Sequence, residues 1–227
     1  MSKTAFWPTI HWGPYTPNIT KKGWNLTRMR RYLEFYRTKF GRQVLKHEAA
    51  YVRRHLRGCE RVLDIACGPG VFERELSDMN ITGVDHATRM IGLARTQAKN
   101  HFHVGKAEKL PFPKSSFDGV FTVASLPYIS DYRRSLDQAA RVLTKDGKIV
   151  VLMVNPRSHY SRETLSKSGY HKRNIKHPNL SPAEVEAHLS KRFEITGEYF
   201  LGIRGKTLFP SKDPRHAAIY AIKGGLK

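Results

Sequence analysis

A glycine-rich turn directly after an apolar segment is the feature that most constrains the fold of this 227-residue chain. Residues 62–66 are apolar apart from Asp64, and Cys67-Gly68-Pro69-Gly70 follows them at once. Glycine has no Cβ, so a strand that ends in such a turn can bring its backbone close to a bound ligand. A second acid, Asp85, ends the next apolar segment. An acid about 20 residues past a glycine-rich turn is placed to bind ribose hydroxyls.

Strand-like and helix-like segments alternate through the middle of the chain. Apolar segments predict strands at residues 61–66, 81–85, 102–105, 117–124 and 148–154, the last after a turn at 145–147. Segments with apolar residues at three- and four-residue steps predict helices at residues 71–78, 88–99 and 131–143. This alternation is typical of an α/β fold with a mostly parallel sheet and helices on both faces. Two further segments, residues 193–203 and 217–222, predict an antiparallel hairpin at one edge of the sheet.

The segments that flank this core have a different composition. Residues 1–25 are rich in proline, glycine and aromatic residues, which predicts an irregular arm. Helical spacing predicts a helix over residues 26–40, a break at Gly41 and a second helix that ends at Gly58. We therefore expect residues 1–57 to cap the site and residues 58–227 to form the main domain. Residues 156–180 are basic and lack an apolar stripe, which predicts a lid or long loop. Ser181-Pro182-Ala183-Glu184 then has the pattern of a helix start.

The composition excludes several classes of protein. No apolar run is long enough to cross a bilayer, and the first residues lack the order of a signal peptide. Cys59 and Cys67 are the only cysteines, which indicates reduced thiols and a cytoplasmic location rather than a disulfide scaffold. No cysteine and histidine spacing resembles a zinc site, so we expect chemistry that needs no metal. The oligomeric state is left open.

The positive charge of the chain is concentrated in its flanks. Of the formal net charge of +21, residues 1–57 carry +11 and residues 155–227 carry +8. Residues 58–154, which hold the glycine-rich turn, carry only +2. Such asymmetry favours an anionic partner, either nucleic acid, a phosphorylated metabolite or an acidic membrane surface. A basic surface that serves only solubility explains the same pattern.

The residues around the turn indicate which kind of ligand it holds. A P-loop would need a lysine after the last glycine, and none follows Gly70. A dinucleotide fingerprint would need a third glycine, and Glu73 stands at that position. The acids Asp64, Glu73 and Glu75 favour a ligand that carries positive charge and no phosphate. S-adenosyl-L-methionine, with its ammonium and sulfonium groups, fits that description.

Five motifs in order resemble those of class I S-adenosylmethionine-dependent methyltransferases. The resemblance covers about residues 60–155 and is strongest to the subgroup that includes the ubiquinone/menaquinone-biosynthesis methyltransferases. It implies a Rossmann-like fold, a methyltransferase activity and S-adenosyl-L-methionine as the cofactor. The matching motifs are residues 62–70, Gly83-Val84-Asp85 with Met90, residues 105–112, residues 116–120, and residues 140–148.

The resemblance also implies how the methionine end of the cofactor is held. Asp64, together with the backbone at Ala66 and Gly68, would bind the ammonium and carboxylate groups. Gly70 would let the backbone approach the ligand closely. These positions all belong to the first motif, so a single turn would determine where the methyl donor lies.

The second and third motifs imply how the adenosine end is held. Asp85 would bind the ribose hydroxyls. His86 and Met90 would border the adenine ring, and the Ala107 backbone with Glu108 would contact its edge.

The segment after the fourth predicted strand would face the methyl group. By the resemblance, Ser125 and Leu126 would lie beside the methionine part of the cofactor. Tyr128 and Asp131 are the candidate catalytic residues, although methyl transfer depends mainly on alignment and can proceed without a dedicated base. The stretch 124–128 lacks the Asn-Pro-Pro-Tyr type of motif, which argues against methylation of exocyclic base nitrogens.

Three functions are consistent with the sequence. The leading hypothesis is a methyltransferase for a small, anionic or aromatic acceptor. The second is an RNA or protein methyltransferase that uses the basic flanks. The third is a non-catalytic S-adenosylmethionine-binding protein.

Overall fold

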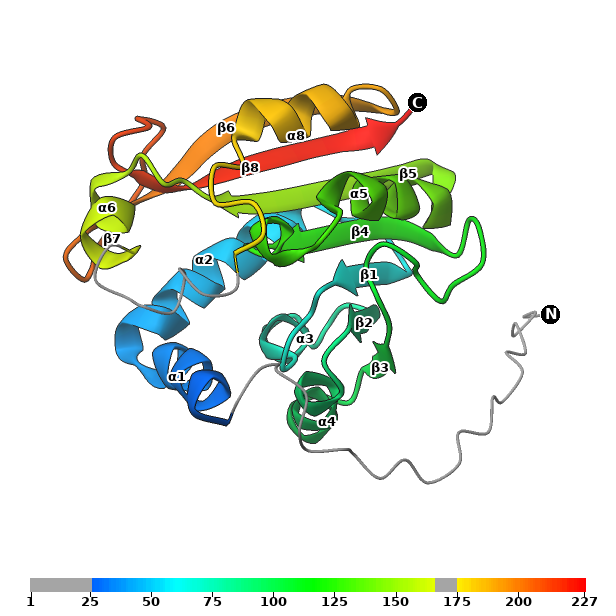
Figure 1. Cartoon of the computed structure of the whole chain (residues 1–227), viewed down its shortest axis with the longest axis horizontal. Coiled ribbons are helices and arrows are strands. Elements are labelled where there is room, and N and C mark those ends of the chain that lie inside the picture. Colours follow the sequence, from blue (N-terminus) through cyan, green and yellow to red (C-terminus); the bar gives the residue numbers. More distant parts are fainter. Residues whose placement is uncertain (1–25, 166–174) are drawn as a thin grey trace.

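The computed structural model describes residues 26–165 and 175–227, which form an eight-stranded sheet with helices on both faces (Figure 1). The strands are β1 (Val62–Ile65), β2 (Ile81–Asp85), β3 (His101–Val104), β4 (Phe117–Val123), β5 (Leu143–Val154), β6 (Phe193–Arg204), β7 (Thr207–Phe209) and β8 (Ala217–Leu226). The helices are α1 (Leu26–Arg37), α2 (Lys39–His55), α3 (Val71–Glu75), α4 (Thr88–Gln97), α5 (Tyr132–Val142), α6 (His159–Leu165) and α8 (Pro182–Leu189), with a 3-10 helix η1 (Leu126–Tyr128).

The strand order confirms the predicted α/β fold. The order is β3-β2-β1-β4-β5-β8-β6-β7, in which the first five strands are parallel. Strands β8, β6 and β7 join antiparallel and form the predicted C-terminal edge, with the short β7 outermost. Because the order reverses between β1 and β4, the loops after these strands diverge and leave room for a ligand.

Strand β5 shows how one sequence supports two hydrophobic cores. Ile149, Val151 and Met153 pack on the face covered by α5 and α8, whereas Val150 and Leu152 pack on the face covered by α2 and α3. Successive side chains of a strand point to opposite faces, so a continuous apolar run is buried on both sides. The apolar face of α2 belongs to the second of these cores, although its residues lie outside the alternating segment.

The boundary between the first two helices is not where the sequence predicted it. The break falls at Thr38, and Gly41 lies inside α2. The Thr38 hydroxyl accepts a hydrogen bond from the Gly41 backbone N–H at 2.9 Å and so caps the helix. A Cβ at Gly41 would collide with the Phe35 carbonyl, so this glycine permits the close approach of α1 and α2 rather than a break.

Two predictions about loops were also wrong in part. Residues 145–147 do not interrupt β5, which runs through them with a shift in register against β4. Part of the expected basic lid is helix α6, which follows β5 after a four-residue connection. The rest of that lid includes residues 166–174, which lie outside the described residues, as does the arm predicted for residues 1–25. The helix start at residues 181–184 is confirmed by a capping box between Ser181 and Glu184.

The described part of the chain holds no helix that is both long and apolar enough to cross a membrane.

Candidate active site

The turn between β1 and α3 has the unusual backbone that its glycines predict. Ala66, Gly68 and Gly70 all have positive φ angles, of 63°, 57° and 76°. A Cβ at Gly68 would meet nothing within 4 Å, whereas one at Gly70 would lie 3.0 Å from the Ala94 Cβ and 3.2 Å from the Phe102 ring. Open space therefore lies beside Gly68, and Gly70 is required by packing against α4 and β3.

Asp85 joins the end of β2 to this turn. Its Oδ2 accepts a hydrogen bond from the Gly68 N–H at 3.0 Å, and its Oδ1 accepts one from the Ala87 N–H at 2.8 Å. The His86 Nδ1 lies 3.5 Å from Oδ1. Burial raises the pKa of Asp85, and the two backbone hydrogen bonds oppose that shift. The carboxylate is thus held in one orientation beside the open space at Gly68.

Asp64 and Glu73 add two more carboxyl groups beneath the turn. Both side chains are buried, and the Glu73 side chain is 0% exposed. Burial, followed by the charges of Glu73 and Asp85, raises the pKa of Asp64 well above its ordinary value. Burial raises the pKa of Glu73 to about 8. The site is therefore rich in carboxyl groups that a nearby cation would help to ionise.

Glu73 does not lie where the sequence reasoning placed it. That reasoning placed it near the ligand at the start of a helix and counted it among the acids that favour a positively charged ligand. Its carboxyl is instead packed against Gly83 of β2, and neither of its oxygens makes a hydrogen bond to a described residue. Because burial raises the pKa of both Glu73 and Asp64, the Asp85 carboxylate, which accepts hydrogen bonds from two backbone N–H groups, carries most of the charge argument.

The remaining predicted cofactor residues lie on the segments that follow β2, β3 and β4, with Met90 on α4 and Leu126 on η1. Met90 and Leu126 are buried, Ala107 lies at the edge of burial, and Ser125 is half-buried with its hydroxyl hydrogen-bonded to that of Thr122. The Glu108 Oε1 accepts a hydrogen bond from the Asp131 N–H at 3.3 Å. The loop after β3 is therefore joined to the loop after β4 through Glu108.

The two candidate catalytic residues have different surroundings. The Asp131 Oδ1 accepts a hydrogen bond from the Arg134 N–H at 2.9 Å and so caps α5. Tyr128 ends η1 and is half-buried, and burial raises its pKa to about 12. The Tyr128 phenol therefore stays protonated at neutral pH. Its backbone neighbour Pro127 accepts hydrogen bonds from the N–H groups of Lys176 and His177, at 2.8 and 3.1 Å.

Sequence reasoning missed Glu48, a buried acid on α2. Its side chain is 4% exposed, and its Oε2 has no hydrogen-bond partner among the described residues. Burial raises the pKa of Glu48 to about 8. One signal was visible in the sequence, because Glu48 stands four residues after Val44 and next to Ala49, within the apolar stripe of the helix.

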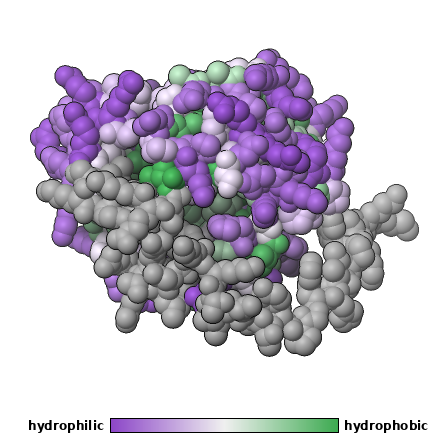
Figure 2. Space-filling model, in the orientation of Figure 1, coloured by the Kyte–Doolittle hydropathy of each residue, from purple (hydrophilic) through white to green (hydrophobic). Residues whose placement is uncertain are grey.

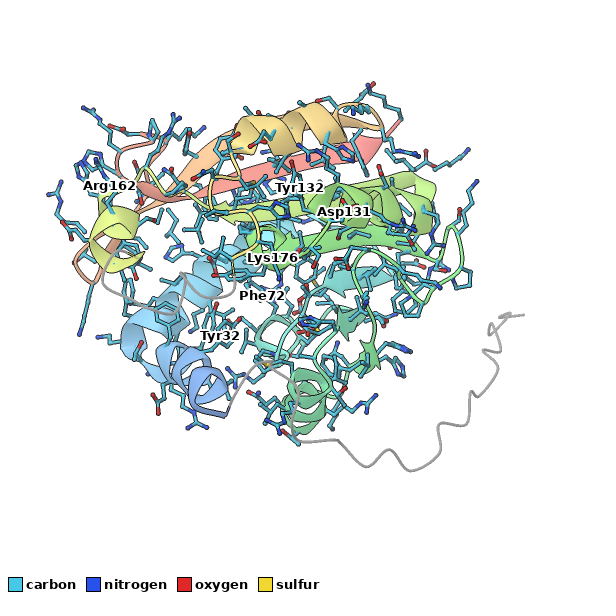
Figure 3. The ribbon with its side chains drawn as sticks, viewed as in Figure 1. Tyr32, Phe72, Asp131, Tyr132, Arg162 and Lys176 are labelled. Atoms are coloured by element: carbon cyan, nitrogen blue, oxygen red, sulfur yellow. The ribbon has the colours of Figure 1, made fainter. Side chains whose placement is uncertain are left out.

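Aromatic rings from three helices surround this part of the molecule. The Tyr32 and Tyr36 rings of α1 lie 5.1 Å apart, and the Phe40 ring of α2 lies 5.9 Å from that of Tyr160 on α6. Burial raises the pKa of Tyr32, and nearby Tyr36, Glu48 and Asp64 raise it further. Tyr32 thus lies near both Glu48 and the carboxyl group at the end of β1. Figure 3 shows Tyr32 extending from α1 toward Phe72 of α3.

The buried and the exposed ionisable side chains of the described residues differ in kind. The buried charged side chains of the described residues are all acidic, namely Glu48, Asp64, Glu73 and Asp85. No lysine or arginine is buried in the part of the chain that the structure describes, so the basic side chains there lie toward the surface. Figure 2 shows a mostly hydrophilic described surface with apolar residues near the centre of the viewed face.

Comparison with known proteins defines the class of this fold and site. A family model described as a methyltransferase domain matches residues 63–151. A demethylmenaquinone methyltransferase of Thermotoga maritima is 36% identical over 102 residues, which is 43% of this chain and 44% of that protein. A ubiquinone/menaquinone biosynthesis C-methyltransferase of Citrifermentans bemidjiense is 34% identical over 109 residues, which is 43% of this chain and 46% of that protein. The chain spans less than half the length of these curated relatives.

Solved structures extend the similarity of fold beyond the matched segment. A Thermotoga maritima S-adenosylmethionine-dependent methyltransferase, described as a possible histamine N-methyltransferase, has a TM-score of 0.72 at 24% identity. That alignment covers 89% of this chain and 96% of the other. A methyltransferase from Archaeoglobus fulgidus has a TM-score of 0.70 at 19% identity, over 86% of this chain and 98% of the other.

Residues 63–151 thus match the methyltransferase-domain family, and the chain has the fold of S-adenosylmethionine-dependent methyltransferases. In sequence, this domain is similar to the methyltransferases of ubiquinone and menaquinone biosynthesis.

The residues of the site fit S-adenosyl-L-methionine, the cofactor of this class. Space is open beside Gly68, and the Asp85 carboxylate is held next to it. Each carboxylate oxygen can accept more than one hydrogen bond, so Asp85 keeps acceptor capacity for ribose hydroxyls. Asp64 supplies a buried carboxyl whose ionised form an ammonium group would stabilise.

Proposed function

We propose that this chain is a methyltransferase that transfers a methyl group from S-adenosyl-L-methionine to a small aromatic acceptor. The observation that carries the proposal is the Asp85 carboxylate fixed beside the open, glycine-lined turn, within a segment that matches the methyltransferase family. The bound cofactor would supply an electrophilic methyl group on a sulfonium centre.

Within this proposal, the residues of the turn and the neighbouring loops bind and orient the cofactor. Asp64 would hold the ammonium group, and the backbone at Ala66 and Gly68 would hold the carboxylate. Asp85 would accept hydrogen bonds from the ribose. His86, Met90, Ala107 and Glu108 would border the adenine, with Ser125 and Leu126 near the methionine part.

The acceptor would bind beside the loop after β4 and the aromatic residues of α1, α2 and α6. Methyl transfer requires the acceptor atom to be aligned with the methyl group, and a rigid aromatic wall would restrict its orientation. Tyr128 remains a candidate to contact the acceptor. The relatives named for demethylmenaquinone and for ubiquinone/menaquinone biosynthesis support an aromatic ring as the acceptor.

The buried charges argue against an anionic acceptor, which the sequence had left open. An anion next to the Asp85 carboxylate would be repelled in a site of low dielectric constant. We therefore narrow the acceptor to an uncharged aromatic molecule. The RNA and protein acceptors suggested by the basic flanks, and the non-catalytic alternative, gain no support from the comparisons.

The experiment that tests this function follows a labelled methyl group from S-adenosyl-L-methionine into a fractionated cell extract treated with the purified chain. We expect label in the small, organic-soluble fraction, resistant to nuclease and protease. Label in nuclease-sensitive or protease-sensitive material would contradict the proposal. Binding of the cofactor without transfer into any fraction would favour a non-catalytic binding protein.

A further inference from the structure

Glu48 is a buried acid that neither the fold nor the cofactor site explains. It lies on α2, outside the segment matched by the methyltransferase family. Its Oε2 is buried without a hydrogen-bond partner among the described residues. Burying a carboxyl group without a partner is unfavourable, and a well-packed apolar residue of similar size is often no less stable. An unpartnered buried polar group of this kind is therefore a candidate for contact with a ligand.

The position of Glu48 links it to the candidate cofactor site. The Glu48 carboxyl is close enough to Tyr32 on α1 and to Tyr160 on α6 to raise the pKa of both phenols. Tyr32 responds in the same way to Asp64 at the end of β1. Helix α6 follows directly from β5, and Figure 1 shows α1 and α6 at the end of the sheet where β1 and β5 finish. Glu48 thus lies near α1 and α6, the helices at the end of the sheet that carries the candidate cofactor site.

The surroundings of Glu48 indicate which chemical group of a ligand would bind to its carboxyl. The core cluster to which α2 contributes is packed against by the rings of Tyr32 and Tyr36 from α1, Tyr160 from α6 and Phe40 from α2 itself. A flat ring would pack favourably among these aromatic groups. Burial raises the pKa of Glu48, so the ionised form is disfavoured, and hydrogen bonding rather than a fixed negative charge determines what Glu48 binds. An uncharged hydroxyl is therefore a better match than an ammonium or an anion.

We propose that Glu48 is the acceptor-recognition residue, and that its Oε2 accepts a hydrogen bond from a hydroxyl group on an aromatic acceptor. This inference rests on the proposed function, because it concerns the acceptor of the same site. It assigns acceptor specificity to α2, outside the matched methyltransferase segment.

The test compares the binding of two fluorescent probes that differ in a single hydrogen-bond donor. 2-Naphthol carries a hydroxyl group, and 2-methoxynaphthalene carries the same ring without the donor. Their affinities for the full chain are measured in the presence of S-adenosylhomocysteine, whose own affinity is measured first by calorimetry. We expect the wild-type chain to bind 2-naphthol at least about tenfold more tightly, because the ether cannot donate a hydrogen bond to the Glu48 Oε2.

Variants of Glu48 determine whether that preference depends on this residue. Glu48→Leu keeps a similar volume and should reduce the preference to about one, whereas Glu48→Gln keeps a carbonyl oxygen and should retain part of it. Glu34→Leu, at an exposed position on α1, is the matched control and should leave the preference unchanged. Thermal unfolding checks that each variant is folded, and Glu48→Gln tests the proposal if Glu48→Leu does not fold.

Three results would overturn the inference. They are equal binding of the two probes to the wild-type chain, an unchanged preference in the Glu48 variants, and tighter binding of cationic 2-(aminomethyl)naphthalene than of 2-naphthol. If S-adenosylhomocysteine binds and the preference is missing, the inference fails and the proposed function stands. If S-adenosylhomocysteine does not bind, the proposed function fails, and the probes without it still report on Glu48.

Discussion

Asp85 accepts a hydrogen bond from the backbone N–H of Gly68 at 3.0 Å, so the acid that ends β2 is tied to the glycine-rich turn after β1. A second hydrogen bond, from Ala87 at 2.8 Å, fixes the other carboxylate oxygen. The two features that were most informative in the sequence are thus in direct contact. A single structural unit holds both the backbone and the carboxylate that a nucleoside-containing cofactor needs.

The two glycines of the turn should respond differently to substitution. Gly68→Ala places a Cβ in open space at a φ of 57°, which should destabilise the fold by about 1 to 2 kcal/mol. Gly70→Ala adds close contacts with Ala94 and Phe102 at a φ of 76°, and should cost about 2 to 4 kcal/mol. Urea unfolding measures both effects.

Cofactor binding should be weakened more by Gly68→Ala than by Gly70→Ala, which is the reverse of the order expected for stability. The Cβ of Gly68→Ala would occupy the space expected for the cofactor, so affinity for S-adenosylhomocysteine should fall in the folded variant. A Gly68→Ala chain that binds as tightly as the wild type would show that the cofactor does not approach this part of the turn.

Asp131 allows helix capping to be separated from contact with the acceptor. The structure gives its carboxylate the role of capping α5, and serine caps helices about as well. Asp131→Ser should therefore keep its free energy of unfolding and its methyl transfer, whereas Asp131→Ala should lose about 1 kcal/mol of stability. Loss of transfer in both variants, with stability kept in Asp131→Ser, would support the catalytic role that the sequence predicted.

The buried carboxyl of Glu73 should make stability depend on pH in a particular direction. Its pKa rises from 4.5 to about 8 on folding, so between these values the folded chain keeps a proton that the unfolded chain has released. The contribution of Glu73 is full below pH 4.5 and is lost as the pH rises, by up to about 1.4 kcal/mol per pH unit.

Glu73→Gln should remove that contribution. Between pH 5.5 and 7.5 the variant should lose about 1 to 3 kcal/mol less stability than the wild type, as measured by urea unfolding at each pH. Glu75→Gln, at a half-buried position on the same helix, is the control and should behave as the wild type does. Equal pH dependence in all three proteins would contradict the burial of an unpartnered acid at Glu73.

The fold could be predicted from the sequence because its signals are local. Near-continuous apolar strands such as residues 149–153 indicate a sheet buried on both faces, and the turn after β1 requires glycine at positions that the sequence supplies. Helix α6 escaped prediction for a physical reason. Ser158, just before the helix, and Ser161, in its first turn, are buried and their hydroxyls hydrogen-bond to each other at 2.9 Å, so no apolar stripe marks the helix.

The site was predicted only in part because burial depends on contacts between distant segments. The positions of Asp64 and Asp85 follow from the ends of two adjacent parallel strands. The same reasoning cannot show that α3 turns Glu73 inward against Gly83, or that Glu48 on α2 is buried. These two acids became informative only when the packing of the helices was known.

The most direct test of the central claim is the calorimetric titration of S-adenosyl-L-methionine into the wild-type chain and into Asp85→Asn. We expect one site of micromolar affinity in the wild type and a loss of about 10- to 100-fold in Asp85→Asn, because a charged acceptor of the ribose hydroxyls is removed. Asp78→Asn, at an exposed acid paired with Arg53, should bind as the wild type does. The absence of binding in the wild type, or equal affinity in Asp85→Asn, would contradict the account.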